Sequence, residues 1–97
     1  MRAQQWLRRL TKGYVYDLQE EIIYFSLPRL KKFAKDTIWG YPMDLNSNED
    51  WQGVLALIIH AMELQLAEYD RELTEAEVEI IKIGLELFHQ YFGALWN

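Results

Sequence analysis

Apolar residues recur at helical spacing along most of this chain. Over residues 14–37 they form two stripes at intervals of three and four, if position 29 is skipped in the first; this spacing places side chains on one face of an α-helix. The first stripe is Leu18, Ile22, Phe25 and Phe33, and the second is Ile23, Leu27, Leu30 and Ala34. A helix that is apolar on two sides is expected at the centre of a bundle, with most of its surface buried.

Pro28 falls inside this predicted helix. Because proline lacks an N–H and its ring clashes with the preceding turn, we expect a kink at this position. The alternative is that Pro28 begins a separate helix after Ser26.

Two further helices are predicted in the second half of the chain. Residues 49–71 carry an amphipathic stripe made of Trp51, Leu55, Ile58, Met62, Leu66 and Tyr69. Residues 75–96 repeat apolar side chains at heptad spacing, at Val78, Ile81, Leu85, Phe88, Phe92 and Leu95. Thr74 and Glu77 match a capping box at the start of the last helix. The short connection between the two helices predicts an antiparallel hairpin.

The remaining segments are an N-terminal stretch and a loop. Residues 1–13 contain a possible short basic helix, which ends at Gly13. Residues 38–50 are predicted to be a loop, because Gly40 and Pro42 favour a turn and Ser47 is a helix-capping type. We therefore predict an all-α fold, with residues 1–97 forming a single domain. Its architecture is a small bundle of three to four helices, with a Pro-kinked central helix and a C-terminal antiparallel hairpin.

Composition adds the expectation of self-association. The chain has 97 residues, of which 51% are apolar and 14% aromatic. That apolar content exceeds what a monomer of this size readily hides, so we expect either a self-interface or a groove for a partner. Of the two, we favour a homo-oligomer. Four aromatic residues near the C-terminus form the predicted oligomer interface: Phe88, Tyr91, Phe92 and Trp96.

The sequence also favours a cytoplasmic protein. It contains no cysteine, which excludes disulfides and thiolate metal sites. The basic N-terminus lacks the apolar region of a signal peptide, and no apolar run approaches the ~20 residues that span a membrane.

Charge is divided unevenly along the chain. Residues 1–35 carry eight basic and three acidic residues, whereas residues 36–97 carry two basic and twelve acidic ones. The division is compatible with two solvated faces, with head-to-tail association, or with an anion site in the basic third. The net charge of −5 argues against binding duplex DNA, which requires many cations.

One candidate binding site combines basic and aromatic residues. Arg29 and Lys32 follow Pro28, and Trp39 and Tyr41 lie in the loop just beyond. Arginine offers a planar fork to a phosphate, and aromatic faces stack on bases or pack on a partner. We therefore predict that these four residues bind a small nucleotide or a host protein. The alternative is that the basic side chains solvate a helix end, where cations also suit the helix dipole.

Catalytic signals are sparse. Glu86 and His89 have the Glu-x-x-His spacing of di-iron bundles, but the facing pair, His60 and Glu63, stands in reverse order. The adjacent acids Glu20 and Glu21 faintly resemble those of helical nucleotide pyrophosphatases, without the second acidic pair of that family. We predict no metal, no cofactor and no enzymatic activity.

Several short motifs stand in a distinctive order over residues 14–65. They are Tyr16-Asp17-Leu18, Leu27-Pro28-Arg29-Leu30-Lys31 with Phe33, Gly40-Tyr41-Pro42, Trp51, and Ile58-Ile59-His60-Ala61-Met62-Glu63. This order resembles a widespread set of small phage and prophage proteins of unassigned function. The sequence departs from that pattern at Gln19, where the pattern has Asp, and at Met62, where it has Phe. The resemblance implies a phage or prophage origin, and it implies no activity for any named residue.

These observations lead to a functional hypothesis. Small phage proteins without catalytic signatures usually act by binding. We expect a non-enzymatic, phage-encoded counter-defence factor in the host cytoplasm, which inhibits a host protein or sequesters a nucleotide signal. The alternatives are an oligomeric structural or assembly protein of the phage and, third, a carboxylate–metal enzyme.

Overall fold

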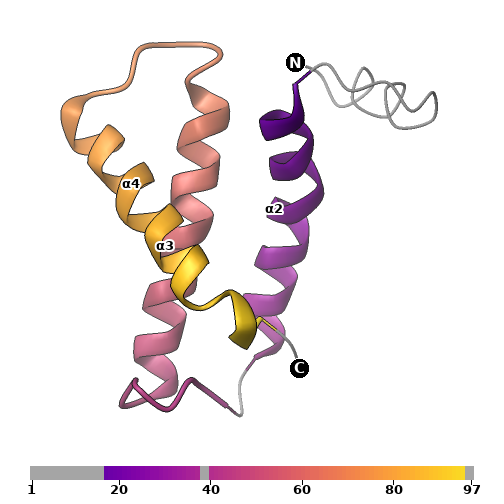
Figure 1. Ribbon diagram of the computed structural model, residues 1–97, viewed down its shortest axis with the longest axis vertical. Coiled ribbons are helices and arrows are strands. Elements are labelled where there is room, and N and C mark those ends of the chain that lie inside the picture. Colours follow the sequence, from indigo (N-terminus) through magenta and orange to yellow (C-terminus); the bar gives the residue numbers. More distant parts are fainter. Residues whose placement is uncertain (1–16, 38–39, 96–97) are drawn as a thin grey trace.

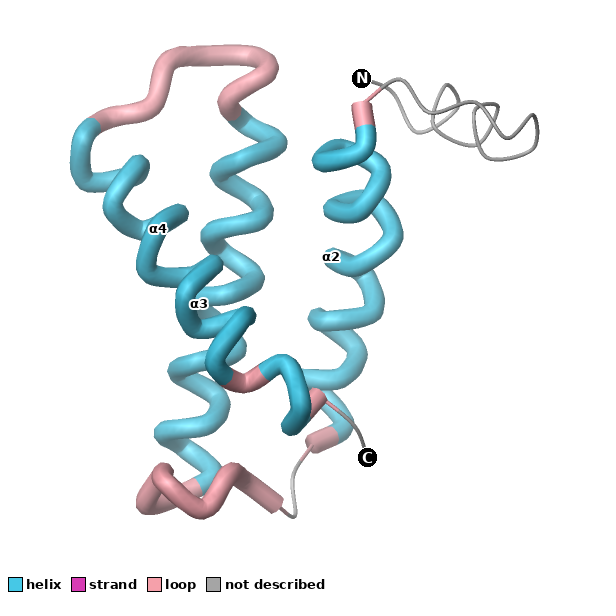
Figure 2. Tube along the Cα trace, in the orientation of Figure 1, coloured by secondary structure: helices cyan, strands magenta, loops and turns pink. Residues whose placement is uncertain are grey.

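The computed structural model describes residues 17–37 and 40–95, and this part of the chain is helical without any strand (Figure 1, Figure 2). The elements in chain order are α2 (Leu18–Asp36), α3 (Asn48–Ala67), α4 (Glu75–Gln90) and the short 3-10 helix η1 (Phe92–Ala94). The predicted all-α class and small helical bundle are therefore confirmed. The helix predicted within residues 1–13 lies outside the described residues.

Each of the three α-helices in the described residues begins at a side chain that caps free N–H groups. Asp17 Oδ1 accepts a hydrogen bond from the Glu20 amide at 3.0 Å, and Ser47 Oγ accepts one from the Asp50 amide at 3.1 Å. Such caps satisfy donors that have no partner within the helix. At α4 the predicted capping box of Thr74 and Glu77 is present in both directions.

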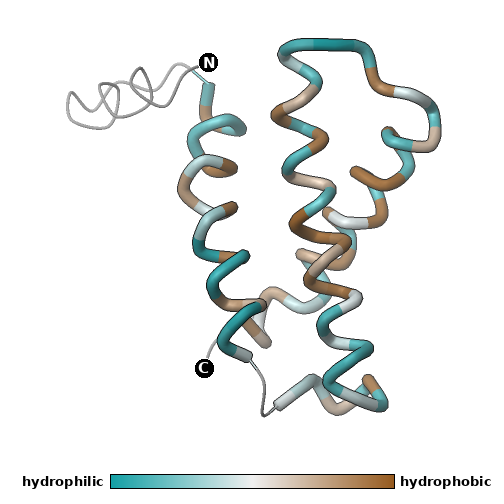
Figure 3. The backbone as a smooth tube through the Cα atoms, turned by 180° about the vertical axis from the view of Figure 1, so that it is seen from behind, coloured by the Kyte–Doolittle hydropathy of each residue, from teal (hydrophilic) through white to brown (hydrophobic). Residues whose placement is uncertain are grey.

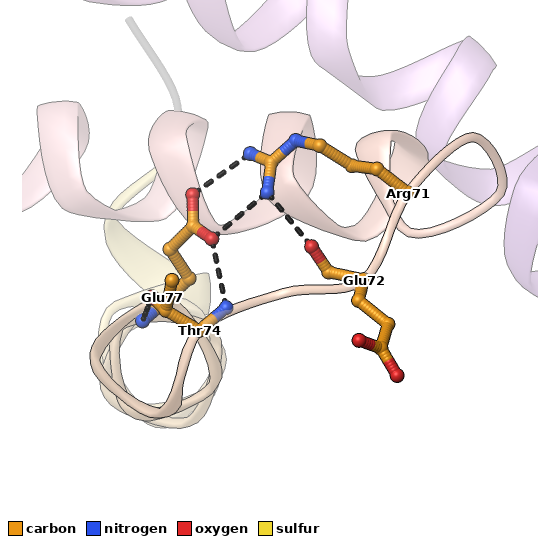
Figure 4. A network of polar contacts seen from close by, with 4 residues as sticks. All are labelled: Arg71, Glu72, Thr74 and Glu77. Atoms are coloured by element: carbon orange, nitrogen blue, oxygen red, sulfur yellow. Dashed lines mark hydrogen bonds and ion pairs between the residues drawn. The ribbon is translucent and has the colours of Figure 1, made fainter.

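An ion pair reinforces the turn between α3 and α4 (Figure 4). Arg71 binds both carboxylate oxygens of Glu77, at 2.9 and 2.8 Å. It also donates to the backbone oxygen of Glu72 at 3.1 Å. The hydrogen bonds from Arg71 and from the Thr74 amide hold the pKa of Glu77 at about 2. One carboxylate therefore caps α4 and fixes the preceding turn.

The central helix is α3, not α2. Both α2 and α4 pack against α3 (Figure 1), and α3 supplies most of the buried apolar residues: Trp51, Leu55, Ile58, Ala61, Met62 and Leu64. Figure 3 shows apolar residues along most of α3. The prediction of a central helix over residues 14–37 is wrong, because α2 meets a helix on one side only in the described part of the chain.

As a result, α2 buries only one of its two predicted stripes. Ile23, Leu27 and Leu30 lie in a core cluster with Ile58 and Met62. Most of the other stripe is open to solvent: Leu18, Ile22 and Phe25 are between 47% and 59% exposed. Its last member, Phe33, is half-buried and packs edge to face on Trp51. The helix runs through Pro28 without ending there, so the alternative of a separate helix starting at Pro28 is wrong.

The α3–α4 pair forms the expected antiparallel hairpin, and the two helices come very close together at Gly84. A Cβ atom built on Gly84 would lie 2.3 Å from the Cβ of Ala61 and 2.7 Å from the carbonyl oxygen of Leu57. Gly84 and Tyr91 are buried on this side of α4. The close approach therefore sets the rotation of α4 about its own axis.

No helix within the described ranges has both the length and the apolar character needed to cross a lipid bilayer.

Candidate protein-binding groove

An apolar groove lies between α2 on one side and the end of α4 with η1 on the other. Its volume is about 300 Å³. The residues that line it are Phe25, Ser26, Arg29, Leu30, Phe33, Phe88, Phe92 and Leu95. Most of these side chains are aromatic or aliphatic, and Arg29 is the cation among them. The groove thus combines apolar walls with one positive charge.

The α2 wall is organised by Phe25 and Arg29, which are one helical turn apart. The guanidinium carbon of Arg29 lies 3.8 Å from the centroid of the Phe25 ring, within the range of a cation–π interaction. Arg29 Nη1 also donates to the carbonyl oxygen of Phe25 at 2.7 Å. A guanidinium has five N–H donors, so this arrangement positions the charge while leaving further donors for a ligand.

The opposite wall is an aromatic pair from α4 and η1. The rings of Phe88 and Phe92 meet edge to face, with centroids 5.5 Å apart and an interplanar angle of 87°. Phe88 is half-buried, whereas Phe92 is 65% exposed. An exposed phenylalanine held by a second ring presents apolar surface at low entropic cost, because its rotation is already restricted.

Tyr91 lies behind this wall, in the core. It is 8% exposed and packs on Trp51 with ring centroids 5.5 Å apart. Its hydroxyl donates to Asp44 Oδ2 at 2.6 Å, and this hydrogen bond raises the pKa of Tyr91. The prediction that Tyr91 belongs to an oligomer interface is therefore wrong, because its ring is covered within the subunit.

The residues predicted to bind a ligand are not gathered in one place. Arg29 lines the groove, but Lys32 does not; instead it forms an exposed ion pair with Asp36 at 3.0 Å. Tyr41 is exposed in the loop before α3 and is absent from the groove lining. Trp39, like Trp96 of the predicted interface, lies outside the described residues. The structure instead joins Arg29 to Phe88 and Phe92, which sequence analysis had assigned to a separate site.

Sequence analysis missed Phe25 as a surface residue. A signal was present, since the stripe of Leu18, Ile22 and Phe25 continues at helical spacing to Arg29. An unpaired arginine is rarely buried. The stripe that contains Arg29 was therefore the better candidate for the solvent-facing side of α2.

A second pocket, of about 200 Å³, is polar and acidic. It lies between the first turns of α2 and the end of α3, and Glu20, Glu63 and Asp70 contribute to its lining. Nearby, the hydroxyl of Tyr69 donates to the carboxylate of Asp17, which raises the pKa of Tyr69 to about 12. This contact ties the start of α2 to the end of α3.

The carboxylate–histidine pairs do not converge on a metal site. Within residues 17–37 and 40–95, no three or more His, Asp or Glu side chains are grouped as ligands. His60 and His89 are exposed, and Glu63 is ion-paired with Lys31 at 3.0 Å. The structure therefore provides no geometry that supports the carboxylate–metal hypothesis.

Comparisons with protein-family models, with curated proteins and with solved structures return no match to this chain. In residues 17–37 and 40–95 the structure has three α-helices, and an aromatic groove with Arg29 in its lining.

Proposed function

We propose that this chain is a non-enzymatic binding protein, encoded by a phage or prophage, that inhibits a host protein in the host cytoplasm. The observation that carries this proposal is the groove formed by Phe25, Arg29, Phe88 and Phe92. Aromatic residues and arginine are enriched at protein interfaces and dominate their binding energy. An open groove with such a lining suits a segment of another protein.

The groove also indicates the chemistry of that segment. Amphipathic helices dock in apolar grooves through side chains at i, i+3, i+4 and i+7. Arg29 stands on the edge of this groove with N–H donors to spare, and a carboxylate is the partner that a guanidinium binds best in a protein. We therefore propose an amphipathic helix with an acidic residue beside its apolar face.

A nucleotide is less well supported as the ligand. A phosphate site usually needs several converging donors or cations. The basic residues that follow Arg29 are partly engaged: Lys31 pairs with Glu63, and Lys32 pairs with Asp36. Arg29 thus stands as the groove's cation among apolar side chains, an arrangement that favours a protein segment over a phosphate.

The assembly hypothesis remains a second candidate, because α4 leaves large apolar side chains exposed. Val78 and Leu85, which belong to the predicted heptad stripe, are 52% and 36% exposed. Exposed apolar patches of this kind commonly mark sites of protein association.

The proposal is tested by affinity capture from a lysate of a bacterial host. The bait is the full chain, compared with Phe92→Asp and with Met43→Asp as a matched control, since Met43 is fully exposed in the loop before α3. We expect one host protein to be retained by the wild type and by Met43→Asp, and to be lost with Phe92→Asp. Equal retention by all three proteins would exclude the groove as the binding site, provided that circular dichroism shows the same helicity for each.

A further inference from the structure

The packing of the three helices leaves one side of the fold uncovered. In residues 17–37 and 40–95, α2 and α4 each pack on α3, whereas their own backbones do not come together. Figure 1 shows these two helices converging towards their C-terminal ends and separating towards their N-terminal ends. In a closed helical bundle, the apolar face of each helix is covered by its neighbours. The side between α2 and α4 is therefore the one that no helix of the described residues covers.

Exposed apolar side chains mark this side. On α2, Leu18 and Ile22 lie two turns and one turn before Phe25, on the same side of the helix. On α4, Leu85 precedes the groove residue Phe88 by three positions. We call the resulting surface the open face; it consists of Leu18, Ile22, Phe25, Leu85 and Phe92, which are between 36% and 65% exposed. The open face extends the groove, because Phe25 and Phe92 belong to both.

A cation borders the open face on each of its two helices. Arg29 follows Phe25 by one turn of α2 and lies in the groove lining. On α4 the exposed Lys82 precedes Leu85 by three positions, so the two side chains are neighbours on the helix surface. The acid that follows Leu85, Glu86, lies ~100° further round the helix. The apolar surface thus has a positive charge at its α2 edge and another at its α4 edge.

We propose that an amphipathic helix of the host protein lies along the open face as a fourth helix of the bundle. Its apolar side contacts the open face, and acidic residues along both of its edges face Arg29 and Lys82. Leu18 and Phe33, the ends of the exposed stripe and the groove on α2, are 15 residues apart in sequence, which corresponds to ~22 Å of helix, or about four turns. This inference rests on the proposed function, because it takes the groove as the binding site, and it adds the length and the charges of the bound segment.

The shape and the charge of the open face both favour this occupant. Docking of an extended segment by strand addition requires an exposed sheet edge, and the described residues contain no strand. A helix satisfies its own backbone hydrogen bonds and presents a row of apolar side chains at i, i+3, i+4 and i+7. The cations Arg29 and Lys82 select a helix with acidic edges over one with basic edges, because unlike charges across an interface attract and like charges repel.

The probe for the first test is a fluorescent peptide of about five helical turns. It carries leucine at i, i+3, i+4 and i+7 and glutamate along both edges of the leucine row, and a matched peptide has lysine in place of each glutamate. Anisotropy titrations with the full chain should give the glutamate peptide a dissociation constant at least about tenfold lower. The difference should shrink at high salt. Equal binding of the two peptides, or no binding of either, would overturn the proposal.

Two pairs of variants locate the bound peptide. Ile22→Asp should weaken binding of the glutamate peptide about tenfold or more. Its control is Ile83→Asp, because Ile83 is 40% exposed, against 47% for Ile22, and lies on the opposite side of α4 from Leu85. Ile83→Asp should bind as the wild type does, and circular dichroism should show the same helicity for both variants. Equal affinities of the two variants would place the peptide elsewhere and overturn the proposal.

The second pair of variants tests the charge at the α4 edge. Lys82→Glu should weaken binding of the glutamate peptide and strengthen binding of the lysine peptide. The control Lys35→Glu makes the same charge change at an exposed residue outside the open face, so its effect on either peptide should be much smaller. If Lys82→Glu left the preference for the glutamate peptide unchanged, the acidic edges of the bound helix would be wrong.

Sedimentation of the wild type and of Ile22→Asp tests the alternative occupant. A wild-type dimer that Ile22→Asp converts to a monomer would place a second copy of the chain on the open face and overturn the proposal. The proposed function is judged separately by the host protein. If neither peptide binds while Phe92→Asp still loses the host protein, the helix on the open face is wrong and the groove keeps its proposed role.

Discussion

Gly84 of α4 and Ala61 of α3 are in such close contact that a Cβ atom on Gly84 would lie 2.3 Å from the Cβ of Ala61. Both residues are buried. This contact lets the backbones of the hairpin approach one another, and it leaves Val78 and Leu85 of the heptad stripe exposed. A single small residue thus influences both the packing of the core and the surface of α4.

Replacing Gly84 should therefore destabilise the fold. Gly84→Ala would force the Cβ against Ala61 and against the backbone oxygen of Leu57, neither of which is the end of a flexible side chain. Overpacking of this kind costs about 1–3 kcal/mol, and the higher helix propensity of alanine offsets only part of it. Urea unfolding should show a lower midpoint for the variant.

Gly53 provides the matched control, because it lies within α3 and a Cβ there would meet nothing within 4 Å. Gly53→Ala should raise the free energy of unfolding by about 0.5–1 kcal/mol through helix propensity alone. If both substitutions stabilised the protein equally, the close contact at Gly84 would be wrong.

The hydrogen bond from Tyr91 to Asp44 should contribute measurably to stability. It connects the end of α4 to the loop before α3, across 47 residues of sequence. Tyr91→Phe keeps the ring against Trp51 and removes only the hydroxyl, so we expect a lower free energy of unfolding. The control is Tyr41→Phe, since Tyr41 is exposed in the same loop. Equal midpoints for the two variants in chemical unfolding would contradict a structural role for this hydrogen bond.

Acid should weaken the α3–α4 turn through Glu77. The pKa of this carboxyl falls from 4.5 to about 2 in the folded protein, so folding favours its ionised form. The stabilisation is fully present above pH 4.5 and is lost as the pH falls from there towards 2. Thermal melts should therefore separate wild type from Glu77→Gln at neutral pH and bring them together near pH 2. A difference in melting temperature that stayed constant down to pH 2 would argue against the ion pair with Arg71.

Alkali should weaken the contact between Tyr69 and Asp17. The pKa of Tyr69 rises from 10 to about 12, so folding favours the protonated hydroxyl, which donates to the Asp17 carboxylate. Its contribution is present below pH 10 and is lost as the pH rises from 10 to 12. Phenolate absorbance should reveal a tyrosine that titrates late in the wild type and is absent from Tyr69→Phe. If the tyrosine that Tyr69→Phe removes titrated with the ordinary pKa of 10, the contact between Tyr69 and Asp17 would be wrong.

The helices and their caps could be predicted from the sequence because each depends on residues that lie close together in the chain. The spacing of apolar residues indicated helices at residues 14–37, 49–71 and 75–96. Both α2 and α4 lie within these limits, and α3 begins one residue earlier, at Asn48. The last helix ends earlier than predicted, because α4 stops at Gln90 and a 3-10 turn follows at Phe92–Ala94. Thr74 and Glu77 were recognisable as a capping box because the four residues from cap to N3 contain the entire motif. The aromatic residues near the C-terminus were predicted to form an oligomer interface; in the structure Tyr91 is buried within the subunit, whereas Phe92 is exposed.

The sequence by itself therefore determined the helices, their caps and the hairpin of α3 and α4, since each depends on residues close together in the chain. Only the tertiary structure decided which apolar stripe of α2 is buried, because burial depends on which helix packs against it. Tertiary packing also left Val78 and Leu85 of the heptad stripe exposed, since Gly84 is the residue that meets Ala61 of α3. The same packing brought Arg29 next to Phe88 and Phe92, about 60 residues away in the chain. The spacing of apolar residues shows which faces of a helix could be buried, whereas the contacts between helices determine which face is buried.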